Sequence, residues 1–84
     1  MMLPWASQAW QDSRYWQSRD RKTLKRINTL VKDVQRQPFE GLGAPEPLGH
    51  QWSGYGSRRI DREHRLVYRV ADNAVVIVHC RYRY

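Results

Sequence analysis

The sequence holds one cysteine, Cys80, in 84 residues, and this scarcity excludes several classes of protein. A single cysteine cannot form a disulfide within the chain and cannot build a cysteine-based zinc site. The three histidines, at positions 50, 64 and 79, are too scattered along the chain for a zinc signature. We therefore expect neither a metal nor a cofactor.

Long hydrophobic runs are also missing. The stretch AVVIV, near the end of the chain, falls far short of the roughly 20 residues of a membrane helix. The amino-terminal residues MMLPWASQAW lack a basic region followed by a long apolar segment, so we expect no signal peptide. No Walker loop, dinucleotide fingerprint or serine or cysteine nucleophile elbow is present. These exclusions predict no contact with a membrane and make the cytoplasm the default location.

Acidic residues are few. Eight Asp and Glu stand against fifteen Lys and Arg, which gives a net charge of +7. Six of the cations fall between positions 21 and 36, and seven between positions 58 and 83. This balance suits nucleic acid, an acidic protein partner, or both in competition for one surface. A solvated basic face would give the same count, and charge alone does not decide between them.

The length predicts a single domain, residues 1–84, with one modest core. Ten aromatic side chains enrich that core. A chain of this size has a small free energy of unfolding, which oligomerisation or a bound partner would increase.

Two helices are predicted in the first half, after a short apolar segment at 2–5 that could form an edge strand. Ser7 is a suitable N-cap for the first helix, whose one side carries Ala9, Trp10, Ser13, Trp16 and Gln17. Asp20 is the expected cap of the second helix, which Pro38 ends. Its apolar stripe has helical spacing and comprises Leu24, Ile27, Leu30, Val31 and Val34.

The second half predicts strands. Prolines and glycines between positions 38 and 49 indicate an ordered but irregular connection, neither helix nor strand. The segments GYGSRRID, EHRLVYRV and AVVIVHCRYRY then read as strands, and Asp72-Asn73 as the turn between the last two.

Placing Ala71 opposite Ala74 fixes the register of this hairpin and the two faces of the sheet. One face, expected to pack on the helices, carries Leu66, Tyr68, Val70, Val75, Ile77 and His79. The other carries Arg65, Val67, Arg69, Val76, Val78, Cys80, Tyr82 and Tyr84. This register predicts that Arg65 and Tyr84 face the same way, whereas strict alternation sends Arg83 to the helix side unless a bulge intervenes.

The remaining reactive groups are carboxylates, guanidinium groups, phenols and imidazoles. This set suits metal-free cleavage of RNA, in which a base deprotonates the 2′-hydroxyl, cations hold the phosphate and an acid protonates the leaving oxygen. Exposed aromatics would stack on unpaired bases. Taken singly, the candidates stay ambiguous. Glu46, between two prolines, could be a surface glutamate, Arg65 could pair with Asp61 or Glu63, and Tyr82 could simply pack on the sheet.

Four motifs, in order, give a more specific indication: PFEGLGAPEPL, SRRID, EHRLVYRV and the terminal CRYRY. Together they closely resemble the YoeB family of toxins within the RelE superfamily, and the resemblance runs from end to end. It implies an α+β, microbial-RNase-like (RelE-type) fold, with two N-terminal helices packed on a mainly antiparallel twisted sheet. It also implies a homodimeric, ribosome-dependent endoribonuclease that cuts mRNA in the ribosomal A site and is neutralised by the acidic segment of a YefM-like antitoxin.

The resemblance assigns roles by position. Glu46 would be the general base, Arg65 the phosphate-binding cation and Tyr84 the residue that positions the substrate. RNA contacts would come from His50, Arg58, Arg59, His64 and Tyr82.

Position 83 departs from the family pattern, because Arg83 stands where a histidine usually acts as general acid. With a pKa above about 12, arginine is a poor proton donor, although it can neutralise charge on the phosphate or the leaving oxygen. The proton could come from His50, Tyr84, a ribosomal group or water. Ala44 and Gly56 also depart, since lysine and an aromatic residue are common there. Two other functions stay open: a ribosome- or RNA-binding inhibitor that does not cleave, and a DNA-binding regulator, which no helix-turn-helix pattern supports.

Overall fold

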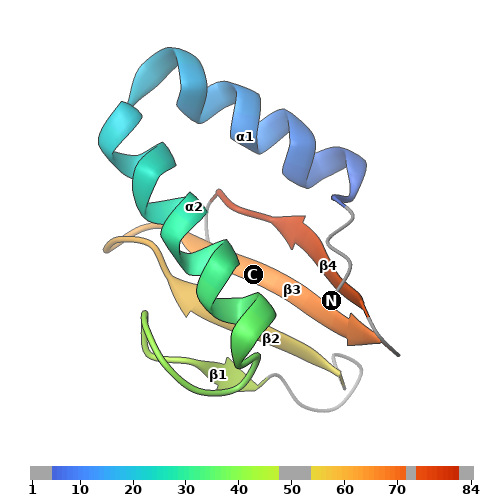
Figure 1. Ribbon diagram of the computed structural model, residues 1–84. Coiled ribbons are helices and arrows are strands. Elements are labelled where there is room, and N and C mark those ends of the chain that lie inside the picture. Colours follow the sequence, from blue (N-terminus) through green and yellow to red (C-terminus); the bar gives the residue numbers. More distant parts are fainter. Residues whose placement is uncertain (1–4, 48–53, 72–73, 82–84) are drawn as a thin grey trace.

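The protein is a two-layer α+β structure in the computed structural model, which describes residues 5–47, 54–71 and 74–81. Two helices, α1 (Ser7–Arg19) and α2 (Arg21–Arg36), precede four strands. The strands are β1 (Glu46–Pro47), β2 (Tyr55–Arg59), β3 (Arg65–Ala71) and β4 (Ala74–His79). They form one antiparallel sheet in the order β1-β2-β3-β4, and both helices lie on one face of it (Figure 1). The fold class predicted from the sequence is confirmed.

The predicted amphipathic pattern of α2 is also confirmed. Ile27, Leu30 and Val34 are fully buried in the core between helices and sheet. The Asp20 carboxylate caps the helix by accepting hydrogen bonds from the backbone N–H groups of Lys22 (3.1 Å) and Thr23 (3.2 Å). These bonds satisfy amide groups that have no partner within the helix.

Helix α1 differs from its prediction in two respects. Ser7 is its first residue rather than its cap; Ala6 occupies the cap position, and no side chain in the described part of the chain caps the helix. The extended backbone of Ala6 is instead held by β4, because its N–H donates to the carbonyl of Ile77 (2.8 Å). Trp5 bridges to Ile77 as well, while residues 2–4 of the expected edge strand lie outside the described residues. Trp10, expected among the inward residues, is 55% exposed, and Asp12 is buried in its place.

The loop after α2 contains a short strand that the sequence did not indicate. Residues Glu46–Pro47 pair with β2, with Glu46 opposite Ser57 and Pro47 opposite Gly56. Pro47 can occupy this position because β1 lies at the edge of the sheet, where no further ladder bond is required of its nitrogen.

The hairpin register is confirmed from Ala71–Ala74 as far as the pair Tyr68–Ile77. Beyond it the register shifts by one, so that Val67 pairs with His79 instead of Val78. This β-bulge reverses the predicted faces at the end of β4. Cys80, expected on the face away from the helices, is buried in the core beneath them, and His79 moves to the opposite face. The placements of Tyr82 and Tyr84, which rested on strict alternation, lie outside the described residues.

Arg58 lies in the interior, contrary to its predicted place at an RNA surface. Its side chain is 0% exposed, and its five N–H groups make five hydrogen bonds within the chain. The Asp33 carboxylate of α2 accepts at 2.6 Å and forms an ion pair with it. We refer to the residues joined to Arg58 as the Arg58 network; the other acceptors are the Tyr68 hydroxyl and the carbonyls of Gln37, Glu40 and Leu42.

The Arg58 network holds the loop between α2 and β1. Asp33 also accepts from the backbone N–H of Leu42 (3.0 Å), and the Tyr68 hydroxyl donates to the carbonyl of Pro38. Gly41 approaches so closely that a Cβ there would lie 2.3 Å from an Asp33 carboxylate oxygen. The loop that leads to Glu46 is therefore fixed by buried polar contacts.

We predict that Arg58→Met destabilises the fold by about 3–5 kcal/mol, because it leaves the Asp33 carboxylate and three loop carbonyls without their donor. Urea unfolding followed by circular dichroism measures this change. The matched control is Arg59→Met at the exposed neighbouring position, for which we expect a change within about 0.5 kcal/mol. Equal stability of the two variants would contradict the structural role of Arg58.

The same network predicts a dependence on pH. The hydrogen bond from Arg58, and then that from Leu42, hold the pKa of Asp33 below its usual value. The unfolded chain therefore binds the proton first, so this stabilisation is complete above about pH 4 and is lost as the pH falls through the lower, folded pKa. Urea unfolding between about pH 6 and pH 2.5 should show the free-energy difference between wild type and Asp33→Asn shrinking as the pH falls. A difference independent of pH would contradict this assignment.

Candidate active site

The candidate site lies on the sheet face that points away from the helices, which we call the site face. Residues directly opposite one another in an antiparallel ladder share a face. The pairings Glu46–Ser57, Ser57–Val67 and Val67–His79 therefore set a row of four side chains across all four strands. Val67 is fully buried but takes no part in the core beneath the helices, in agreement with this placement.

Glu46 and Arg65, the two principal candidates from the sequence, come together on this face. An Nη of Arg65 lies 3.7 Å from a Glu46 carboxylate oxygen. The Arg65 side chain is 13% exposed, whereas that of Glu46 is 55% exposed. The partner of Arg65 is thus Glu46 and not Asp61 or Glu63, which the sequence suggested as ordinary alternatives. Asp61 instead accepts from the backbone N–H groups of Glu63 and His64.

Further contacts orient the Arg65 guanidinium group. Its Nε–H donates to the Ser57 hydroxyl (3.0 Å), and an Nη donates to the carbonyl of Ala44 (3.3 Å). Ser57 is fully buried, so its hydroxyl is a fixed acceptor. No motif in the sequence points to Ser57, because a single serine in a strand forms no pattern of its own. Only the pairing of β1, β2 and β3 shows that it lies between Glu46 and Arg65.

The backbone before Glu46 turns sharply to present these groups. Gly43 has φ +79°, and Ala44 has φ +49°, which is uncommon for a residue with a side chain. The carbonyl of Gly43 accepts from the N–H of Arg59 (2.6 Å), and a Cβ at Gly43 would lie 3.0 Å from the Arg59 carbonyl oxygen. A glycine is therefore required at 43, and the turn aims the next carbonyl at Arg65.

This arrangement can bind and act on an anion. Arg65 contributes a fixed positive charge with hydrogen-bond donors in a plane, a geometry that matches phosphate. Glu46 is exposed, carries the carboxylate that contacts Arg65 and can accept a proton at the edge of the site. Among the described residues, no group of three histidine, cysteine or acidic side chains is arranged to hold a metal ion.

The remaining predicted residues fall in different places. Arg59 is exposed at the end of β2, directly opposite Arg65 and on the same face, so it stays a candidate for RNA contact. His64 lies on the helix side, where its ring meets that of Trp16 edge-on at 4.8 Å. Arg58 is excluded from the surface by its burial. Four further residues with predicted roles lie outside the described residues: His50, Tyr82, Arg83 and Tyr84.

Helix α1 holds the chain just beyond β4. The Trp16 indole N–H donates to the carbonyl of Cys80 (2.8 Å), and the N–H of Cys80 donates to the Asp12 carboxylate (3.1 Å). The Arg81 guanidinium lies over the Tyr15 ring, 3.5 Å from its centroid. Burial raises the pKa of the Cys80 thiol to about 12, so this cysteine stays protonated and does not act as a nucleophile.

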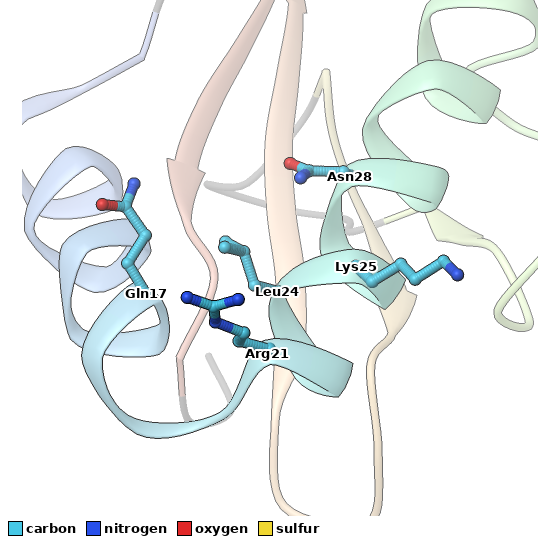
Figure 2. A pocket seen from close by; sticks show the side chains of 5 residues that line it. All are labelled: Gln17, Arg21, Leu24, Lys25 and Asn28. Carbon is cyan, nitrogen blue, oxygen red and sulfur yellow. The ribbon is translucent and has the colours of Figure 1, made fainter.

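A separate groove of about 510 Å³ lies between the two helices, lined by Gln17 of α1 and by Arg21, Leu24, Lys25 and Asn28 of α2 (Figure 2). It belongs to the helix layer and not to the site face. Its charged groups are an arginine and a lysine, so it can attract an anion but offers no carboxylate or imidazole for acid–base chemistry.

Gly56 has a structural explanation as a departure from the family pattern. It pairs with Tyr68, and a Cβ at position 56 would lie 2.8 Å from the Tyr68 ring and hydroxyl. The Tyr68 side chain, fixed by the Arg58 network, occupies the space that a larger residue at 56 would need.

Comparison of the sequence with known families gives the class of protein, a bacterial toxin. Residues 5–84 match the family model described as the YoeB-like toxin of bacterial type II toxin-antitoxin system. The chain belongs to this YoeB-like toxin family.

Individual relatives agree with this assignment. The chain is 54% identical to Toxin YoeB of Escherichia coli K12 over 84 residues, which is the full length of both. The solved YoeB/ParE toxin from Agrobacterium tumefaciens is 43% identical, with a TM-score of 0.95 and full coverage of both chains. YoeB of Staphylococcus aureus has been solved as a dimer and in a heterotetrameric complex with YefM, with TM-scores of 0.91 and 0.88. Each of these two is 45% identical and covers all of this chain, which spans 98% of theirs.

Neither helix in the described part of the chain has the length and apolarity needed to cross a membrane.

We predict that Ser57→Ala loosens the Arg65 side chain, because it removes the acceptor of the Nε–H group. The hydrogen exchange rate of that Nε–H, followed by NMR, should rise by roughly tenfold, since a hydrogen bond to a charged group contributes at least about 1.5 kcal/mol. Thr29→Ala, which removes a hydroxyl from the exposed side of α2, serves as the control. An unchanged exchange rate at Arg65 in Ser57→Ala would contradict the role given to Ser57.

Proposed function

We propose that this protein is a ribosome-dependent mRNA endoribonuclease, the toxin of a type II toxin–antitoxin pair, which cuts mRNA in the ribosomal A site and so inhibits translation. The observation that carries the proposal is the Glu46–Arg65 pair on the site face, with Arg65 oriented by Ser57 and by the Ala44 carbonyl. Membership of the YoeB-like toxin family supports it.

The chemistry follows from the two charged groups. Glu46 takes the proton from a ribose 2′-hydroxyl, and the resulting oxygen attacks the adjacent phosphorus. Arg65 binds the phosphate oxygens, whose negative charge grows as the fifth bond to phosphorus forms. In the free protein a Glu46 carboxylate oxygen lies 3.7 Å from an Nη of Arg65. When RNA binds, its phosphate replaces this carboxylate as the anion that Arg65 contacts.

Residues on both sides of this pair would complete the RNA contacts. Arg59 lies opposite Arg65 and adds a second cation on the same face. The family resemblance assigns substrate positioning to Tyr84 and further RNA contacts to His50 and Tyr82, and the permanent charge of Arg83 suits it to neutralising charge on the phosphate or the leaving oxygen. We retain these four roles as parts of the proposal. His64 is left out, because its side chain packs against Trp16.

The proposed partners follow from charge and from the relatives. A net charge of +7 suits both RNA and an acidic inhibitor. We propose that a YefM-like antitoxin neutralises the protein, as the complex of the Staphylococcus aureus relative suggests, and that the chain forms a homodimer like that relative. Ribosomes and mRNA place its action in the cytoplasm.

A non-cleaving inhibitor that only occupies the ribosome is the second candidate, favoured by Arg83 at the position of the family's acid. The two functions differ in the fate of the mRNA: cleavage shortens it, whereas occupancy stalls translation and leaves it intact.

We predict that the wild-type protein cuts mRNA within the A-site codon of initiated ribosomes and that Glu46→Ala lowers the cleavage rate by about 10²–10⁴-fold, since the general base is lost. Primer extension on the mRNA measures the cut. Glu63→Ala is the matched control, because Glu63 is another exposed carboxylate, 82% accessible and away from the pair. Inhibited translation with intact mRNA in the wild type would favour the non-cleaving inhibitor.

A further inference from the structure

The β-bulge in β4 changes which groups share the site face. If the register of Ala71–Ala74 continued without a shift, His79 would lie opposite Leu66 and point toward the helices. With it, His79 lies opposite Val67, in the row that contains Ser57 and Glu46. The neighbouring Cys80 turns into the core, where its sulfur contacts the carbonyl of Ala9. An imidazole thereby joins the carboxylate and the guanidinium on one face.

The spacing of this row suits a phosphodiester between two catalytic groups. Neighbouring strands lie about 4.8 Å apart, so three spacings separate the backbones at Glu46 and His79 by about 14 Å. The Glu46 carboxylate reaches into this gap, 3.7 Å from Arg65, which leaves room for a phosphodiester between it and His79. The Arg65 guanidinium, held beside Ser57, lies between the two ends of the row.

The His79 ring is partly enclosed by the fold. The residue is only partly buried, and its Nδ1 has no hydrogen-bond partner in the described part of the chain. This nitrogen is shielded from solvent, so contact with RNA would fall to the exposed part of the ring. Burial lowers the pKa of His79, against the opposing effects of the Asp12 carboxylate and the Arg81 backbone. A phosphate held by Arg65 would add negative charge nearby and favour the protonated form.

We infer that His79 is the general acid that protonates the leaving 5′-oxygen, in place of the histidine that Arg83 has replaced. This inference rests on the proposed endoribonuclease function and names a further catalytic residue for it. The bond between the 2′-oxygen and phosphorus forms as the bond from phosphorus to the 5′-oxygen breaks. The electron pair of the broken bond leaves with that oxygen, which takes the proton of the imidazolium. The products are a 2′,3′-cyclic phosphate and a free 5′-hydroxyl, and solvent then takes the proton from Glu46 and returns one to His79.

The test compares two mRNAs on initiated ribosomes. One is natural, and in the other a sulfur atom replaces the leaving 5′-oxygen at the A-site linkage. A thiolate leaves without protonation, because a thiol is far more acidic than an alcohol. We expect His79→Gln to cleave the natural mRNA about 10²–10⁴-fold more slowly than wild type. On the sulfur-containing mRNA we expect rates within about tenfold of each other, since the acid is no longer needed.

Two controls make the outcomes distinct. Glu46→Gln should stay slow on both substrates, because the 2′-hydroxyl still needs a base. Val76→Ala, on the same strand and face as His79 but without a titratable group, should resemble wild type on both. Thermal unfolding of each variant, followed by circular dichroism, verifies the fold. Equal loss on both substrates in His79→Gln, or no loss on either, would overturn the assignment to His79. If the wild type cleaves neither mRNA, the nuclease proposal itself is overturned.

Discussion

The buried ion pair between Asp33 and Arg58 is the interaction on which the rest of the structure depends. A guanidinium group with no exposure to solvent must satisfy each of its donors within the chain. Arg58 does so by joining α2, β3 and the loop that follows α2. Buried ion pairs add little net stability compared with apolar packing, but they penalise every arrangement that leaves one partner unpaired. The pair therefore selects one conformation for a loop rich in proline and glycine.

That loop connects the interior to the site. It ends at Glu46, which pairs with Ser57 in the neighbouring strand, and Ser57 in turn orients Arg65. Three consecutive residues of β2 thus serve different ends: Ser57 supports the site, Arg58 fixes the loop and Arg59 lies exposed beside Arg65. The alternation of side chains along a strand makes this possible, because neighbouring residues point to opposite faces. We therefore expect a substitution at Arg58 to disturb the site through the loop, although Arg58 itself does not contact the substrate.

The end of β4 shows a second way in which the core controls the site. Asp12 and Trp16 of α1 bind both backbone groups of Cys80, and the Cys80 side chain is buried beneath the helix. These contacts require Cys80 to face inward. The single extra residue at Val78 allows this while β3 and β4 stay paired, and it turns His79 to the site face. The β-bulge thus allows both the attachment of α1 to Cys80 and the position of the His79 imidazole on the site face.

The sequence by itself determined the two helices, the three longer strands and the family of this protein. Local signals sufficed for that: the apolar stripe and Asp20 cap of α2, the hairpin with Ala71 opposite Ala74, and four motifs in family order. It also selected Glu46 and Arg65, since the motifs carry those positions. Only the tertiary structure decided that Arg58 is interior and Arg59 exposed, that Ser57 orients Arg65, and that His79 shares the site face. The first two outcomes depend on contacts between residues far apart in the chain, and the third depends on the unpaired Val78 in β4. Periodicity within a segment predicts neither, because it carries no information about which distant group will satisfy a buried charge or where a strand will bulge.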